Sequence, residues 1–216
     1  MQLERLRTTP APRDSLATIL RSDTNVVSLP RVLDLSIKSG LEKLLHRPGF
    51  DHTVQLDTRA PDASALLASI PDGPERAFLE ADIRDLAGQL GGLLERKHIH
   101  ASLSIQRTDG CRKIHTDYVS LRLLCTYAGP GTEWVPNADL VRENLGRTDV
   151  NVDAANRSMI RRGAVLRSCA PGELLLLKGE AYPGNSAWGA AHRSPPIEAR
   201  GASRLVLKLD EHPCGC

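Results

Sequence analysis

The spacing of apolar residues changes near residue 98, and this change constrains the fold more than any other feature of the sequence. Before it, residues 75–96 repeat apolar side chains at helical spacing, which predicts one long amphipathic helix. After it, apolar and polar residues alternate with a period of two, the pattern of half-buried strands. Helices followed by strands predict an α+β fold, in which a β-sandwich or jelly-roll barrel is backed by the N-terminal helices.

Residues 1–97 are predicted to form a mainly helical cover that is integral to the domain, and residues 98–216 to form its β core. Besides the long helix, the cover is expected to contain a short extended segment at 25–30, one or two helices at 31–45 and a short helix at 64–70. Gly40 is expected to interrupt the helical segment at 31–45, because glycine weakens a helix interior.

Six segments of the β core are predicted as strands: 99–105, 112–118, 119–127, 132–135, 173–178 and 204–210. Between the fourth and fifth of these, residues 136–163 are polar and irregular in pattern. A segment of this length without regular structure is usually functional, so we expect a loop that closes over a substrate.

The last predicted strand sorts its side chains onto two distinct faces. Arg204, Val206 and Lys208 share one face, and the intervening leucines share the other. If Arg204 points into the barrel, the leucines point outward and need an apolar cover. The stripe of the helix at 75–96 is predicted to supply it.

Composition narrows the range of partners. The formal net charge of +2 is too small to indicate a nucleic-acid or membrane-surface partner, so both are expected to be absent. No apolar run approaches the roughly 20 residues of a membrane span. The first residues contain no apolar signal core, and we therefore expect a cytoplasmic protein.

The cysteines do not suggest a disulfide framework. There are five of them, an odd number, and they are scattered along the chain. Cys214 and Cys216, at the end of the sequence, are either incidental thiols or ligands for a soft metal.

Three residues of the β core form a candidate metal site. His115 and Asp117 are two apart in a segment predicted to be extended, so both side chains leave the same face. His192 lies between two predicted strands and is the best-placed third ligand. Two imidazoles and one carboxylate with open coordination positions suit iron(II), manganese or zinc, and are the ligand set of the non-haem iron(II) oxygenases.

The surrounding segments strengthen this hypothesis, because residues 98–210 resemble the double-stranded β-helix of the 2-oxoglutarate- and iron(II)-dependent oxygenases. The pattern is most similar to that of the prolyl-hydroxylase-like branch. The segments that carry the resemblance are residues 101–107, His115-Thr-Asp117, 121–127 with the turn Gly-Pro-Gly-Thr-Glu133, 171–177, 192–196 and 203–207. Most of the chain is also similar to a bacterial family described only as a domain of unknown function.

The resemblance implies an iron(II)- and 2-oxoglutarate-dependent oxygenase, and we expect a hydroxylase. His115, Asp117 and His192 would be the iron ligands. Arg204 would pair with the far carboxylate of 2-oxoglutarate, and the hydroxyl of Tyr127 would help to hold this co-substrate. The sequence departs from the family in a slightly long interval between His192 and Arg204 and in the residues of the Gly-Pro-Gly-Thr-Glu133 turn.

Other functions remain open at this point. One is a non-catalytic, zinc-handling protein on the same barrel, with Cys214 and Cys216 as auxiliary ligands. Another is a cupin-like isomerase or hydrolase with Glu133 as its base. Separately, His98 and His100 could form a second metal site. A small molecule, a peptide and a protein side chain are all possible substrates, and the sequence does not determine the oligomeric state.

Overall fold

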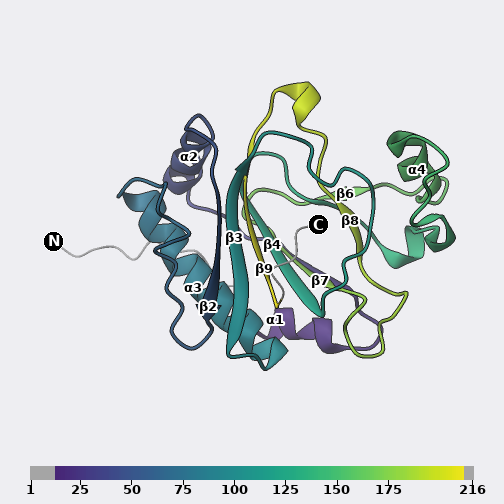
Figure 1. Ribbon diagram of the computed structural model, residues 1–216, viewed down its shortest axis with the longest axis horizontal. Coiled ribbons are helices and arrows are strands. Elements are labelled where there is room, and N and C mark those ends of the chain that lie inside the picture. The colour runs from purple at the N-terminus through teal and green to yellow at the C-terminus, as the bar shows by residue number, and fades with distance from the viewer. Residues whose placement is uncertain (1–12, 212–216) are drawn as a thin grey trace.

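The computed structural model describes residues 13–211, which form two antiparallel sheets flanked by helices (Figure 1). The larger sheet has six strands in the order β1-β7-β4-β9-β3-β2, and each pairs antiparallel with its neighbours. Their bounds are β1 (Val26–Leu29), β7 (Leu174–Lys178), β4 (Leu121–Ala128), β9 (Arg204–Asp210), β3 (His98–Gln106) and β2 (Asp51–Asp57). The fold is therefore mixed α and β, as the sequence predicts.

The smaller sheet has three short strands in the order β6-β5-β8. These are β6 (Arg167–Ser168), β5 (Glu133–Val135) and β8 (Ala191–Arg193). A single residue, His115, adds to its edge through two backbone hydrogen bonds of 3.0 Å with His192. The metal motif and the distal histidine are thus joined by backbone pairing.

The helices lie on both sides of the sheets. The structure contains α1 (Arg13–Ala17), α2 (Leu35–Leu44), α3 (Pro74–Leu94) and α4 (Val152–Ser158), with 3-10 turns η1 (Thr18–Leu20), η2 (Asn137–Asp139), η3 (Arg142–Asn144) and η4 (Glu198–Arg200). Within the described residues, no helix is both long and apolar enough to cross a membrane.

α2 and α3 cover one face of the larger sheet (Figure 1). α3 begins with Pro74 after Gly73 and ends at Leu94, and the next residue, Glu95, adopts the left-handed conformation that commonly terminates helices. The apolar stripe of α3 packs on the leucines of β9 that face the helices, away from the cavity, to form the main core, which confirms the predicted cover. The members of the stripe buried in this core are Phe78, Leu79, Ile83, Leu86 and Leu90.

The space between the two sheets is half apolar and half polar. Over β1, β7 and β4 it is filled by a second core that includes Leu124, Trp134 and Leu175. Over β9, β3 and β2 it is lined by polar side chains and forms a cavity of about 230 Å³. The alternation of β9 explains this division, because Arg204 and Lys208 face the cavity while the leucines face the helices.

Residues 136–163 do not cover the cavity. They contain η2, η3 and α4 and contribute Leu140, Ala155 and Met159 to a third core, which packs against Ile114 and Ala191. These last two residues are the sequence neighbours of His115 and His192, so this core lies on the outer face of the smaller sheet. Contrary to expectation, the segment is therefore not irregular, and none of its residues lines the cavity in this structure. Its closure over a substrate stays a prediction.

Three expectations about local structure are also wrong. Gly40 does not interrupt α2, where it is buried in the helix, and the side chain of Glu75 fills the space that a Cβ would need. Residues 64–70 form successive turns, and 112–118 pair only at His115. β2 was not expected at all, because as an edge strand it has exposed or half-exposed residues at most positions.

We expect Leu207→Ala to destabilise the protein by about 2–5 kcal/mol, because Leu207 is fully buried between β9 and the helices. Chemical denaturation monitored by circular dichroism measures the change. The matched control is Leu35→Ala, since Leu35 is 83% exposed and its truncation should change the free energy of unfolding by less than about 0.5 kcal/mol. Equal effects in the two variants would contradict the assignment of the core.

Candidate metal centre

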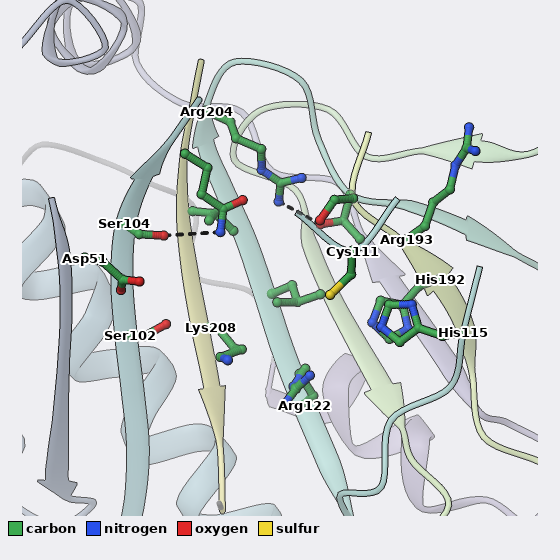
Figure 2. Close-up of a pocket in the computed structure, with 15 residues that line it drawn as sticks. Asp51, Ser102, Ser104, Cys111, His115, Arg122, His192, Arg193, Arg204 and Lys208 are labelled. Carbon is green, nitrogen blue, oxygen red and sulfur yellow. Dashed lines mark hydrogen bonds between the residues drawn. The ribbon is translucent and has the colours of Figure 1, made fainter. Parts of the chain in front are cut away.

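His115, Asp117 and His192 meet at the polar end of the space between the sheets. Their ligand atoms all lie within 4.8 Å of one another, and the two imidazole rings are 4.6 Å apart between centroids. Among residues 13–211, no other group of three or more His, Cys, Asp or Glu side chains has this arrangement. Figure 2 shows the two rings side by side at the cavity wall.

The tautomers of both histidines suit metal binding. Nδ1 of His115 lies 2.8 Å from the carbonyl oxygen of Lys113, and Nδ1 of His192 lies 3.2 Å from that of Ala190. A carbonyl oxygen only accepts hydrogen bonds, so each Nδ1 carries the proton and each Nε2 offers its lone pair. Nε2 of His115 is buried and has no hydrogen-bond partner within the described residues, as expected of an atom that awaits a metal ion.

Asp117 lies between the two imidazoles. Its Oδ1 is 3.5 Å from Nε2 of His115, and its Oδ2 is 3.1 Å from Nε2 of His192. Burial raises the pKa of Asp117, but the two adjacent imidazoles and the charge of Arg122 outweigh burial and hold this pKa well below its usual range. The carboxylate is therefore ionised, as a metal ligand must be.

The pKa of His115 is raised above its ordinary value. Burial lowers this pKa, but the nearby carboxylate of Asp117 and the hydrogen bond of Nδ1 with the Lys113 carbonyl outweigh burial. In the metal-free protein the site thus binds protons more readily than free histidine does. Protons and a metal ion compete for the same Nε2 atom.

A close approach of two backbone segments fixes the metal motif. A Cβ on Gly179 would lie 2.1 Å from the carbonyl oxygen of Val119, so only glycine fits there. The next residue, Glu180, donates its backbone N–H to the carbonyl of Asp117 over 2.9 Å and accepts a hydrogen bond of 2.6 Å from the hydroxyl of Thr116. These contacts hold the turn that presents Asp117.

Arg204 enters the same cavity from β9 (Figure 2). It is 2% exposed, and its Nη2 donates to the hydroxyls of Thr126 and Thr132 over 3.2 and 3.0 Å. Its Nε and Nη1 are buried and have no partner among the described residues. Burial lowers the pKa of Arg204 to about 10, and the guanidinium still carries its charge at neutral pH. The cavity therefore contains a buried cation with two donors that face no acceptor.

Tyr127 lies on the opposite face of β4 from the cavity. Its hydroxyl donates to Oδ2 of Asp82 on α3 over 2.8 Å, and its ring contacts Phe78 edge-to-face. Asp82 also forms a buried ion pair of 2.6 Å with Arg31. Burial, followed by the charge of Asp82, raises the pKa of Tyr127 well above its ordinary value. The structure does not bring Tyr127 to the cavity, and we remove it from the expected co-substrate site.

Other candidate residues are placed as follows. Glu133 is engaged with Nε of Arg193 over 2.6 Å and is not free to act as a base. His98 and His100 lie on β3 without a third ligand beside them, within the part of the chain that is described. Cys214 and Cys216 lie outside the described residues.

Sequence reasoning missed Arg122, which contacts Asp117. Arg122 is 2% exposed in a strand that is buried at every position, and its Nη1 donates to Oδ2 of Asp117 over 2.7 Å. The available signal was an arginine in the otherwise uncharged segment Leu-Arg-Leu-Leu-Cys-Thr-Tyr127, since a buried charge needs a partner. That signal indicates an ion pair but does not identify the partner.

We expect His115→Ala and His192→Ala to lower the affinity for Co²⁺, an optical probe of the site, by more than about 100-fold, because loss of an outer-shell partner alone typically costs 10–100-fold. Titration followed by visible absorption measures it. His98→Ala is the control and should bind Co²⁺ like the wild type. Retention of wild-type affinity by both ligand variants would show that the three residues are not a metal site.

We expect Tyr127→Phe to destabilise the fold by about 1.5–3 kcal/mol, because it removes a hydrogen bond to an ionised carboxylate. The same variant should bind 2-oxoglutarate as the wild type does, in a calorimetric titration with Co²⁺ present. A tenfold loss of that affinity with unchanged stability would return Tyr127 to the co-substrate site.

Solved structures of other proteins share similarity with the fold of this chain. Its fold is similar to that of the dioxygenase for auxin oxidation 1 from Arabidopsis thaliana in complex with 2-oxoglutarate, at 10% identity and a TM-score of 0.51, over 92% of this chain and 86% of that one. HygX from Streptomyces hygroscopicus with nickel and 2-oxoglutarate bound is 16% identical at a TM-score of 0.49, over 94% and 88%. A Pseudomonas putida prolyl-4-hydroxylase is 10% identical at 0.43, over 94% and 100%.

The first of these similarities shows that this chain and that dioxygenase share a fold, and the two with lower scores carry no argument. No curated protein matches the sequence. One family model matches residues 11–210, nearly the whole chain. The chain therefore belongs to the family described as protein of unknown function, DUF1826.

Proposed function

We propose that this protein is an iron(II)- and 2-oxoglutarate-dependent oxygenase, and specifically a hydroxylase, whose two sheets are those of a double-stranded β-helix. The observation that carries the proposal is the pairing of two features in one cavity of about 230 Å³. One is the His115–Asp117–His192 cluster, and the other is the buried guanidinium of Arg204, two of whose nitrogens have no partner among the residues that the structure describes.

The environment of Arg204 indicates an anionic ligand. A buried cation without a counter-ion is costly, and two threonine hydroxyls do not neutralise it. The planar guanidinium matches a carboxylate, which can accept from two of its nitrogens at once. 2-Oxoglutarate has carboxylates at both ends, so one can bind Arg204 while the other end reaches the metal.

The donor set fits iron. Two Nε2 atoms and a carboxylate leave coordination positions open, and both Nδ1 atoms are held by backbone carbonyls. Iron bound there would supply oxygen activation, coupled to conversion of 2-oxoglutarate to succinate and carbon dioxide. The protein's own residues orient the ligands, anchor the co-substrate and limit the access of water, since His192, Asp117 and Arg204 are each less than 10% exposed.

The remaining cavity wall favours a small hydrophilic substrate or a polar part of a larger one. β3 contributes Ser102, Ser104 and Gln106, β9 contributes Lys208, and Asp51 lies at the edge on β2. Apart from the two histidines, no aromatic residue among those described lines the cavity. Single-stranded nucleic acids are commonly held by stacking on aromatic rings, so we propose a small molecule, peptide or protein side chain as the substrate and no nucleic acid.

The test is succinate formation by the purified protein, loaded anaerobically with iron(II) and then given 2-oxoglutarate and air. We expect slow turnover without the primary substrate. Arg204→Ala should lower the apparent affinity for 2-oxoglutarate by about 10–100-fold or more, because it removes a charge-assisted contact to a carboxylate worth about 1.5–3 kcal/mol.

Arg162→Ala is the matched control, since Arg162 is exposed and does not line the cavity. Its succinate formation should equal that of the wild type. No turnover together with stoichiometric zinc in the isolated protein would replace the proposal with a non-catalytic zinc-handling protein. Absence of both turnover and metal would make the cluster a structural coincidence.

A further inference from the structure

We propose that Arg122 is a positioning residue that presents Asp117 to the metal through one carboxylate oxygen, and that Asp210 holds Arg122 for this task. The inference rests on the proposed function, because it concerns the same metal centre. It adds two residues to the site that do not touch the metal. Neither belongs to the His115–Asp117–His192 cluster.

Asp117, Arg122 and Asp210 form a network of three charged side chains, with Arg122 between the two carboxylates. Nη1 of Arg122 donates to Oδ2 of Asp117 over 2.7 Å, while Nε and Nη2 donate to Oδ2 of Asp210 over 2.8 and 2.6 Å. Side-chain exposure is 2% for Arg122, 9% for Asp117 and 1% for Asp210. Water therefore screens these contacts little, and each carboxylate keeps the guanidinium in one orientation.

The larger sheet positions the Arg122–Asp210 ion pair without the help of a metal ion. Arg122 on β4 and Asp210 on β9 are directly opposite each other in the antiparallel ladder. Cross-strand partners on one face bring their side chains together, so the register of the sheet itself forms the Arg122–Asp210 pair. Asp117 lies five residues before Arg122, in the turn that leads into β4.

The consequence for the metal centre follows from the chemistry of a carboxylate. A free carboxylate can bind a cation through one oxygen or through both. Arg122 donates a charge-assisted hydrogen bond to Oδ2, which also lies 3.1 Å from Nε2 of His192. This bond favours Oδ1, which lies 3.5 Å from Nε2 of His115, as the ligand atom. A one-oxygen ligand leaves more open positions for a co-substrate and oxygen than a two-oxygen ligand does.

The same strand ties both halves of the site together. β9 begins with Arg204, the proposed co-substrate anchor, and ends with Asp210, the support of Arg122. β9 lies in the interior of the sheet between β4 and β3, and its leucines are packed against the helices. The positions of the co-substrate anchor and the metal-ligand carboxylate are therefore set by one rigid element.

The test is Co²⁺ binding to the double variant Arg122→Met/Asp210→Asn, which removes the cation without leaving Asp210 as a buried unpaired charge. We expect the dissociation constant for Co²⁺ to rise about 10–100-fold, as for loss of other outer-shell partners. The visible spectrum of the bound Co²⁺ should also change, because Asp117 is then free to bind through both oxygens. Arg122→Lys, which keeps one cationic donor, should recover most of the affinity and the wild-type spectrum.

A matched control separates positioning from general destabilisation. Arg31 and Asp82 form a second buried ion pair, 5% exposed on each side, at the helical face of the same sheet. The double variant Arg31→Met/Asp82→Asn should lose comparable stability on thermal unfolding but keep the affinity and spectrum of the wild type for Co²⁺.

The outcomes distinguish this inference from the proposed function. A wild-type protein that binds no Co²⁺ overturns both. Wild-type binding with an unchanged affinity and spectrum in a folded Arg122→Met/Asp210→Asn variant overturns the positioning role alone. An equal loss of Co²⁺ affinity in the Arg31→Met/Asp82→Asn control would also overturn it, since the effect would then come from the fold. Should the Arg122 double variant not fold, a changed spectrum in Asp210→Asn supports the inference and an unchanged one overturns it.

Discussion

The alternation of side chains across the two central strands, β4 and β9, is the constraint on which the rest of the structure depends. Successive residues of a strand leave opposite faces, so the same seven or eight residues build both a core and a site. In β9 the leucines enter the core under α3, while Arg204 and Lys208 line the cavity. In β4 the same alternation directs Tyr127 toward the helices and Arg122 toward the candidate metal centre.

Three arginines have buried side chains and differ in whether a carboxylate of the protein neutralises their charge. Arg31 is paired with Asp82, and Arg122 is paired with Asp117 and Asp210. Arg204 is equally buried, but within residues 13–211 it donates hydrogen bonds only to hydroxyl groups, and its Nε and Nη1 have no partner there. Because burying an unpaired charge costs several kcal/mol, the fold bears a cost at Arg204 that an anionic ligand would offset.

Much of the fold was predictable where a pattern has one interpretation. The alternation of polar and apolar residues from Arg204 to Leu209 and the apolar stripe of α3 predicted that the leucines of β9 pack against this helix. The position of Tyr127 was not predictable, because β4 is buried on both faces and its sequence does not show which face is which. β2 was missed for the opposite reason: an edge strand with mostly exposed residues lacks an apolar pattern. The three candidate metal ligands were predicted from chemistry and resemblance, whereas their partner Arg122 needed the register of the sheet.

The division of the space between the sheets explains how so few residues can hold a site open. Where β1, β7 and β4 face the smaller sheet, Trp134 and Leu175 fill the gap and fix the spacing of the two layers. Where β9 and β3 face it, polar side chains leave the gap open as a cavity. On the opposite side of the smaller sheet, the core that contains Met159 packs against Ala191 of β8, the strand that also contains His192. Core packing thus supports the two imidazoles, and Arg122 of β4 holds the carboxylate of Asp117, which lies in a turn. The geometry of the candidate metal centre is therefore set by contacts of this turn with the sheets.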